Sequence, residues 1–299
     1  MAYQLVLTGL LVGGLVGVTG TGGGSLMTPL LVIVFGFSPT TAIGTDIFHG
    51  AVFKSVAALR HRRLGTVQGR LSGWMLLGSA PTSLLGVWLA TWLRHRYGSG
   101  LDAAMGVVLG ATLVAAALGL TAKALLSEAA IDKPFVLRRR DRVAAVLIGL
   151  VGGFVVGLTS VGSGVFFGLT LLVVFPLRAA KVVGTDIFHA AVLLWVASAG
   201  HLLAGNVDLH AAGWLLVGSV PGVLLTSRFA VRVPDRPLRL GLAAVLLLSG
   251  VKLLELPGGV ADAAVLGGTL GLAGVLFWLA ARRRRAPLLV AGRRAAPIR

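Results

Sequence analysis

Apolar residues along this chain are gathered into runs, and the first two runs are unusually short. Residues 5–18 and 26–37 are apolar, yet each run falls short of the roughly 20 residues that a helix needs to cross about 30 Å of hydrocarbon. We therefore expect two half-helices separated by a break at the glycine-rich stretch between them. Backbone groups in such a break can lie at membrane depth only if protein covers them or they line a wet cavity.

Longer apolar runs follow and predict membrane-spanning helices. The run 47–59 continues a helix that we expect to begin near Ala42, and the runs 71–93 and 101–120 are each long enough to cross a bilayer with some tilt. The stretch 121–142 is a substantial polar connection in the middle of the chain. We therefore place the boundary between two halves there.

The second half repeats the first at an offset of 140 residues. The hexapeptide Gly-Thr-Asp-Ile-Phe-His occurs at 44–49 and again at 184–189, and the correspondence runs without a gap over residues 13–85 and 153–225. An apolar run at 260–280 has no partner in the first half. The sequence thus predicts a first transmembrane repeat at 1–142, a second at 143–257, an extra transmembrane helix at 258–281 and a basic cytoplasmic tail at 282–299.

The two repeats are predicted to cross the membrane in opposite directions. Each half makes three or five crossings, depending on whether its short runs span the bilayer, and an odd number starts the second half on the opposite side. The loop 59–71 contains four arginines, whereas its counterpart 200–210 contains no lysine or arginine. Because cytoplasmic loops are enriched in Lys and Arg, we expect the N-terminus outside and the basic tail inside.

Composition narrows the class of protein further. Of the 299 residues, 56% are hydrophobic and 12% are charged, which predicts an all-α polytopic membrane protein in contact with the lipid bilayer. The net charge of +17 comes from Lys and Arg between the apolar runs, so we expect no nucleic-acid partner. The absence of cysteine excludes disulfides and thiolate metal sites. We expect no metal ion and no cofactor, and the oligomeric state stays open.

The glycine-rich breaks are the candidate substrate site. Inverted repeats joined at broken helices place a site near the membrane midplane, where helix N-termini offer unpaired N–H groups to a small anion. Hydroxyl side chains add donors, and glycine lets the backbone approach a ligand closely. The alternative is that the small residues only allow close helix packing. The predicted substrate-binding residues are Thr19, Thr21, Gly22, Gly23, Gly24, Ser25 and Thr45 in the first half and Thr159, Ser160, Gly162, Ser163, Gly164 and Thr185 in the second.

Asp46 and Asp186 are the acidic residues that the pattern places within the apolar core. Carboxylates inside a membrane are costly, so they are candidates for a functional role. His49 and His189 follow three residues later, on the same helical face. We predict that these four residues couple transport to protons. The alternative is that the Thr-Asp pairs only cap the starts of two helices.

Lys54 has a leucine, Leu194, at the matching position of the second repeat. A lysine in a membrane protein can extend its ammonium group to the interface while its stem stays in apolar surroundings. We therefore expect Lys54 to extend toward the basic loop that follows it rather than to bind substrate.

Four stretches carry a family resemblance, namely Thr19–Pro29, Gly44–His49 and their copies at 159–170 and 184–189. With the two tandem modules around them, they resemble the TauE/SafE sulfite exporter family over residues 5–255. The resemblance implies secondary transport of a small sulfur-containing or organic anion, such as sulfite, thiosulfate or an organosulfonate, in a bacterial inner membrane. It also implies coupling to an ion gradient.

Functions other than transport have less support in the sequence. Neither His-Glu-x-x-His, nor Gly-x-Ser-x-Gly, nor a phosphate-binding Gly-x-x-x-x-Gly-Lys-Ser/Thr loop occurs, so we do not expect an enzyme. We expect an exporter that works by alternating access about a midplane site and is coupled to protons. A passive anion channel and a permease for a non-sulfur organic acid are the alternatives.

Overall fold

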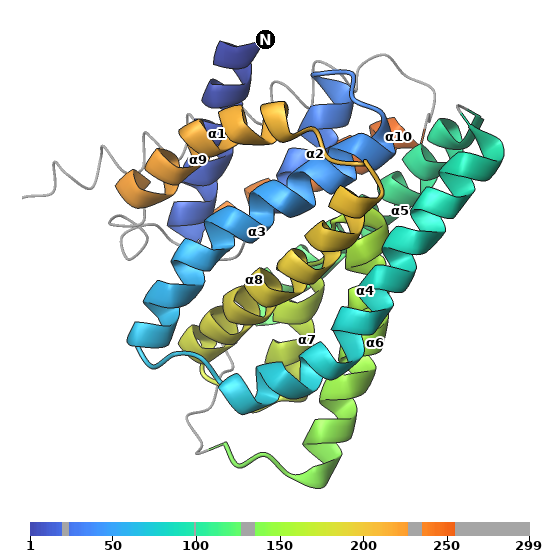
Figure 1. The fold of residues 1–299 in the computed structure, drawn as a ribbon. Coiled ribbons are helices and arrows are strands. Elements are labelled where there is room, and N and C mark those ends of the chain that lie inside the picture. Colours follow the sequence, from blue (N-terminus) through green and yellow to red (C-terminus); the bar gives the residue numbers. More distant parts are fainter. Residues whose placement is uncertain (20–23, 99, 127–134, 227–234, 255–299) are drawn as a thin grey trace, which may run out of the picture.

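The computed structural model describes residues 1–19, 24–98, 100–126, 135–226 and 235–254 (Figure 1). These residues form ten α-helices and contain no strand. The predicted all-α class is confirmed. The expected extra helix at 258–281 and the basic tail at 282–299 lie outside the described residues.

The helices divide equally between the two halves of the chain. Those of the first half are α1 (Ala2–Thr19), α2 (Gly24–Ile33), α3 (Pro39–Arg63), α4 (Gly69–Tyr97) and α5 (Gly100–Leu126). Their counterparts in the same order are α6 (Arg139–Thr159), α7 (Phe166–Val174), α8 (Ala179–Leu203), α9 (Leu209–Thr226) and α10 (Asp235–Leu253).

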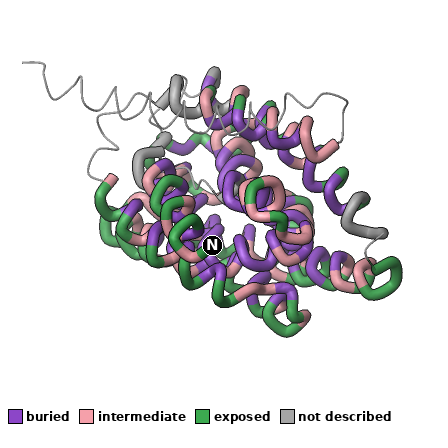
Figure 2. Tube along the Cα trace, turned by 90° about the horizontal axis from the view of Figure 1, so that it is seen from above, coloured by how far each residue is buried: buried purple, intermediate pink, exposed green. Residues whose placement is uncertain are grey.

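The outside of the helix bundle is apolar. Within the described residues, five helices are long and apolar enough to cross a membrane, at 69–97, 104–122, 139–159, 180–203 and 209–226. Buried residues gather on the inward faces of the helices (Figure 2), while Leu77, Trp88, Leu118, Leu147 and Val151 are exposed. Lipid is as apolar as these side chains, so a bilayer accounts for their exposure. The chain is a multi-pass membrane protein.

Both repeats contain a short helix, α2 or α7. The break after α6 covers 160–165, whereas the corresponding stretch between α1 and α2, residues 20–23, lies outside the described residues. Helices α2 and α7 have 10 and 9 residues, so at 1.5 Å per residue each extends roughly 15 Å, about half the hydrocarbon thickness. The predicted second break and the shortness of the second apolar run are confirmed. With 18 residues, α1 is longer than the half-helix expected for the first run.

Helices α3 and α8 lie side by side at the centre and run antiparallel (Figure 1). Gly44, near the start of α3, lies against the backbone carbonyl of Asn206, just beyond the end of α8. Gly184, near the start of α8, lies against Thr66, just beyond the end of α3. Thr66 and Asn206 are equivalent positions of the repeat. Each contact therefore has a counterpart with the halves exchanged.

Helices from different halves also pair through glycine. Helix α1 packs on α9, and its counterpart α6 packs on α4. Gly13 lies against the backbone of Ser219, and the equivalent Gly153 lies against that of Ser79. A glycine at such a contact lets two helix backbones approach closely, which is the usual basis of helix pairing in membranes.

The central helices begin earlier than the sequence predicts. Helix α3 begins at Pro39 rather than near Ala42, and Ser38 caps it through its side chain. Proline at the first helical position suits a helix start, because its fixed φ is already helical. Helix α8 begins at the equivalent position. The Thr-Asp pairs at 45–46 and 185–186 thus lie inside their helices and do not cap the starts of α3 and α8. The two threonine hydroxyls instead accept backbone N–H groups just before α9 and α4.

Candidate functional site

The Asp46 carboxylate lies where α2, α3 and the second break meet. Its side chain is only 1% exposed. One carboxylate oxygen, Oδ2, accepts hydrogen bonds from Thr28 Oγ1 at 2.5 Å and from Ser160 Oγ at 2.8 Å. The other, Oδ1, has no hydrogen-bond partner within the described part of the chain. A buried carboxylate oxygen without a partner is costly, so this atom is a place for a proton or a ligand.

The backbone conformation of the second break places the Ser160 hydroxyl against the Asp46 carboxylate. Ser160 ends α6 in the left-handed conformation, with φ 61°. It is the one non-glycine residue with a positive φ among the described residues. Gly162 follows with φ 111°, a conformation open to glycine because it has no side chain. Unusual backbone conformations of this kind gather at functional sites.

Lys54 lies in the buried centre and not at the membrane surface. Its side chain is 1% exposed, and Nζ donates to the backbone oxygen of Ser163 at 3.1 Å and to Ser163 Oγ at 2.8 Å. Asp46 and Asp186 are the buried carboxylates of the described residues. The expectation that Lys54 extends toward the basic loop is therefore wrong. A buried ammonium needs polar partners, and the helix break supplies them.

The two histidines form matched contacts across the halves. His49 Nε2 lies 2.8 Å from Ser219 Oγ on α9, and His189 Nε2 lies 2.9 Å from Ser79 Oγ on α4. Both rings are buried, and neither Nδ1 has a hydrogen-bond partner within the described ranges. Each imidazole thus connects a central helix to the other repeat. No group of three or more His, Asp or Glu side chains in the described residues is arranged to hold a metal ion.

Three predicted substrate-binding hydroxyls make contacts within the fold. Thr45 Oγ1 accepts the backbone N–H of Asp208 at 3.0 Å, and Thr185 Oγ1 accepts that of Gln68 at the same distance. Thr159 Oγ1 donates to a carbonyl one turn back in α6 at 2.7 Å. Substrate binding by these threonines stays a prediction.

The remaining predicted residues divide between the two breaks. Thr19 ends α1, and Gly24 and Ser25 begin α2. Ser160, Gly162, Ser163 and Gly164 form the second break. Thr21, Gly22 and Gly23 lie outside the described residues. The structure therefore brings Ser160 and Ser163 together with Asp46 and Lys54.

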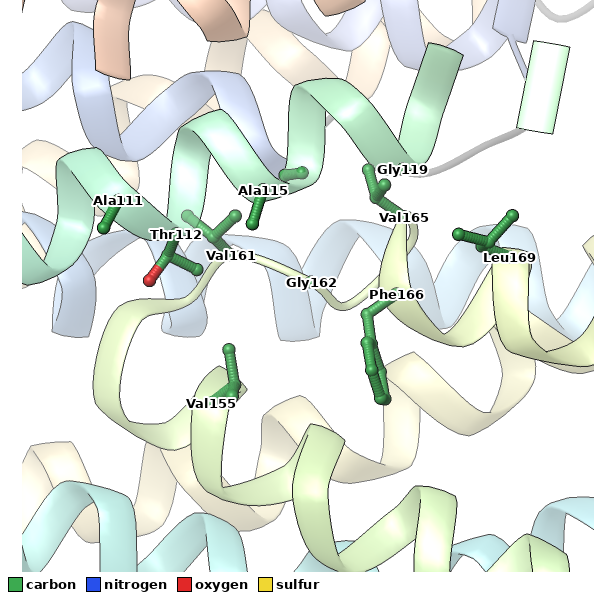
Figure 3. Close-up of a pocket in the computed structure, with 11 residues that line it drawn as sticks. Ala111, Thr112, Ala115, Gly119, Val155, Val161, Gly162, Val165, Phe166 and Leu169 are labelled. Carbon is green, nitrogen blue, oxygen red and sulfur yellow. The ribbon is translucent and has the colours of Figure 1, made fainter. Parts of the chain in front are cut away.

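A cavity of about 400 Å³ lies beside the second break (Figure 3). Its lining comprises Ala111, Thr112, Ala115, Ala116, Gly119, Val155, Val161, Gly162, Val165, Phe166 and Leu169. Among the described residues, no charged side chain lines the cavity, and Thr112 supplies the one side-chain oxygen. The cavity can hold an apolar group, whereas the side chains suited to an anion are those around Asp46 and Lys54.

Two residues of the site were missed by reasoning from the sequence. Thr28 lies within the first glycine-rich motif but belongs to α2, where its hydroxyl reaches Asp46. Lys54 follows Asp46 by two steps of four residues, which keeps it on roughly the same side of a helix. That spacing, together with Leu194 at the matching position, was the signal that Lys54 has a role of its own.

We expect Thr28→Val to destabilise the protein. Valine has a similar shape but removes the hydroxyl that donates to the Asp46 carboxylate, and a hydrogen bond to a charged group contributes about 1.5–3 kcal/mol. The midpoint of thermal unfolding in detergent should fall. Thr170→Val is the control, because the hydroxyl of Thr170 bonds only to carbonyls of its own helix. Equal shifts in the two variants would show that the contact with Asp46 adds nothing.

Comparison with known proteins identifies a family and several relatives. The family model for the sulfite exporter TauE/SafE matches residues 5–253. Probable membrane transporter protein YjnA of Bacillus subtilis (strain 168) is 36% identical over 256 residues, which is 85% of this chain and 100% of that protein. Probable membrane transporter protein YdhB of the same organism is 26% identical over 255 residues, covering 84% and 99%. No solved structure matches the chain. Since the family model covers nearly all of the described residues, the chain belongs to the sulfite exporter TauE/SafE family of membrane transporters.

Proposed function

We propose that this protein is a secondary transporter that exports a small sulfur-containing or organic anion, such as sulfite, thiosulfate or an organosulfonate. The observation that carries this proposal is the buried polar cluster at the second break, where Asp46, Lys54, Ser160 and Ser163 meet. An ammonium group and hydroxyl donors in apolar surroundings make strong hydrogen bonds to an anion. Membership of the family supports transport as the activity.

Protons are the proposed coupling ion. Asp46, His49, Asp186 and His189 are all buried in the two antiparallel central helices. Ionisable side chains inside a membrane protein mark proton relays and ion pathways. If one of these groups takes up a proton when the anion binds, the movement of the proton across the membrane is coupled to the movement of the anion.

Alternating access about the central helices is the proposed mechanism. The matched contacts of the two repeats support a rocking movement of one repeat against the other, which exposes one site to each side in turn. The four arginines of 59–71, against none in 200–210, support an N-terminus outside and a cytoplasmic C-terminus in a bacterial inner membrane.

Flux measurements in proteoliposomes test this function. We expect the purified protein to take up sulfite, thiosulfate or an organosulfonate with a rate that saturates with concentration and changes with an imposed pH gradient. Vesicles without protein are the control. A passive channel would give a flux that stays linear with concentration and cannot accumulate the anion, and a complete lack of anion flux would show that the protein is not an anion transporter.

A further inference from the structure

The buried centre has one cationic side chain and two acidic ones. Within the described residues, the buried charged side chains are Lys54, Asp46 and Asp186. Leu194, which matches Lys54 in the second repeat, is also buried, with 2% exposed. The duplication therefore supplies two aspartates but a single ammonium group.

Building on the anion transport proposed above, we propose that Lys54 binds the negative charge of the substrate and that Asp46 takes up one proton as the anion binds. The site therefore selects singly charged anions over doubly charged ones, which among the substrates proposed above favours hydrogensulfite and organosulfonates over thiosulfate.

The hydrogen bonds of Lys54 leave room for an anion. An ammonium group has three N–H donors. Two of them are used by the backbone oxygen and the hydroxyl of Ser163, and the third has no hydrogen-bond acceptor among the residues that the structure describes. Both acceptors are uncharged, so an anion that replaces one of them gains the stronger charge-assisted hydrogen bond.

The charges around Lys54 require a proton to accompany the anion. With both aspartates ionised, the three side chains sum to one negative charge, and a bare anion would add another in apolar surroundings, where unbalanced charge is costly. An anion that enters with one proton leaves the sum unchanged. Asp46 can accept this proton at Oδ1, which is buried and has no hydrogen-bond partner within the described ranges. A protonated Asp46 carboxyl then donates to the bound anion.

The remaining groups around Asp46 are poorly suited to take up a second proton. Thr28 on α2 and Ser160 in the break contribute hydroxyls. His49 on α3 and His189 on α8 each bond a serine through Nε2 and pack on an aromatic ring, and a buried imidazolium in such apolar surroundings is costly. A doubly charged anion that enters with one proton would thus leave one charge unbalanced, in a centre where Asp186 is a second buried carboxylate.

The test compares anions of different charge in proteoliposomes that contain a pH-sensitive dye. The singly charged probes are methanesulfonate, acetate and hydrogensulfite, and the doubly charged probes are sulfate and thiosulfate. We expect one proton to enter with each singly charged anion, and we expect kcat/KM for the doubly charged probes to be at least about tenfold lower. Equal transport of both classes, or no proton movement, would overturn the proposal.

The Lys54→Met variant tests the role of the ammonium group, and Leu194→Met at the equivalent position of the second repeat is its control. Loss of one partner from a buried charged contact is costly, so we expect kcat/KM for methanesulfonate to fall about 100-fold or more in Lys54→Met. Leu194→Met should transport as the wild type does. Lys54→Arg keeps the charge and should retain saturable uptake. Size-exclusion profiles in detergent show whether each variant is folded.

The outcomes separate this proposal from the function on which it rests. If the wild type carries none of the five anions, anion transport is wrong and the role of Lys54 is wrong with it. If the wild type transports and a folded Lys54→Met keeps its KM and proton ratio, only the role of Lys54 is wrong. If Lys54→Met does not fold, the proposal is tested by the wild-type protein alone, through its preference for singly charged anions and the number of protons that enter with each anion.

Discussion

Vesicles that contain the Asp46→Asn variant are expected to equilibrate the anion but not to accumulate it on a pH gradient. Asparagine keeps the size of the side chain and an oxygen that accepts the hydroxyls of Thr28 and Ser160, but it cannot take up a proton. A difference of one pH unit corresponds to about 1.4 kcal/mol, or about tenfold accumulation for one proton per anion. We expect the accumulation ratio to fall from roughly tenfold to about one.

Asp208→Asn makes the same chemical change outside the buried centre. The Asp208 side chain accepts the backbone N–H of Ala211 at the start of α9, and asparagine can do the same. This control should accumulate the anion as the wild type does. Full accumulation by Asp46→Asn would mean that the proton is carried elsewhere, with Asp186 as the next residue to replace.

Gly78→Ala is expected to cause the largest loss of stability among single methyl additions to α4. A Cβ at residue 78 would collide with the backbone carbonyl of Val146 and lie 2.8 Å from the backbone nitrogen of Leu150, both on α6. Backbone atoms cannot move aside as a flexible side chain can, so the two helices must separate. We expect a cost of about 3 kcal/mol and a clear drop in the thermal unfolding midpoint in detergent.

Gly73→Ala provides the comparison within the same helix. A Cβ at residue 73 would meet nothing within 4 Å, and alanine is favoured over glycine in a helix by about 1 kcal/mol. This variant should be as stable as the wild type or slightly more stable. A similar loss in both variants would show that glycine matters in α4 for a reason other than contact with α6.

Local sequence patterns were enough to predict the main features of the architecture. Two features predicted the helix breaks. The apolar runs are too short for one helix to cross the membrane, and the glycine-rich stretches contain residues that tolerate unusual backbone angles. Ser160 and Gly162 adopt those angles in the second break. The hexapeptide at 44–49 and its copy predicted a central position for Asp46 and Asp186, and both are buried on adjacent helices.

One local signal and several contacts between distant residues explain the differences between the sequence predictions and the structure. The start of α3 was misplaced because Ser38 and Pro39 were not recognised as a helix start. Lys54 was expected at the interface because its partner Ser163 lies 109 residues further along the chain, and no local pattern connects the two. Thr28 was overlooked for the same reason, since its bond to Asp46 crosses from α2 to α3.

The pairing of α1 with α9 has a consequence for how the protein is made. Helix α1 ends at Thr19, whereas α9, the helix that covers Gly13, does not begin until Leu209. During synthesis the glycine face of α1 therefore stays in lipid, or in contact with the insertion machinery, until most of the chain has emerged. Final packing is a late event that joins the first helix to one of the last, so chains truncated before residue 209 should be targets for membrane proteases.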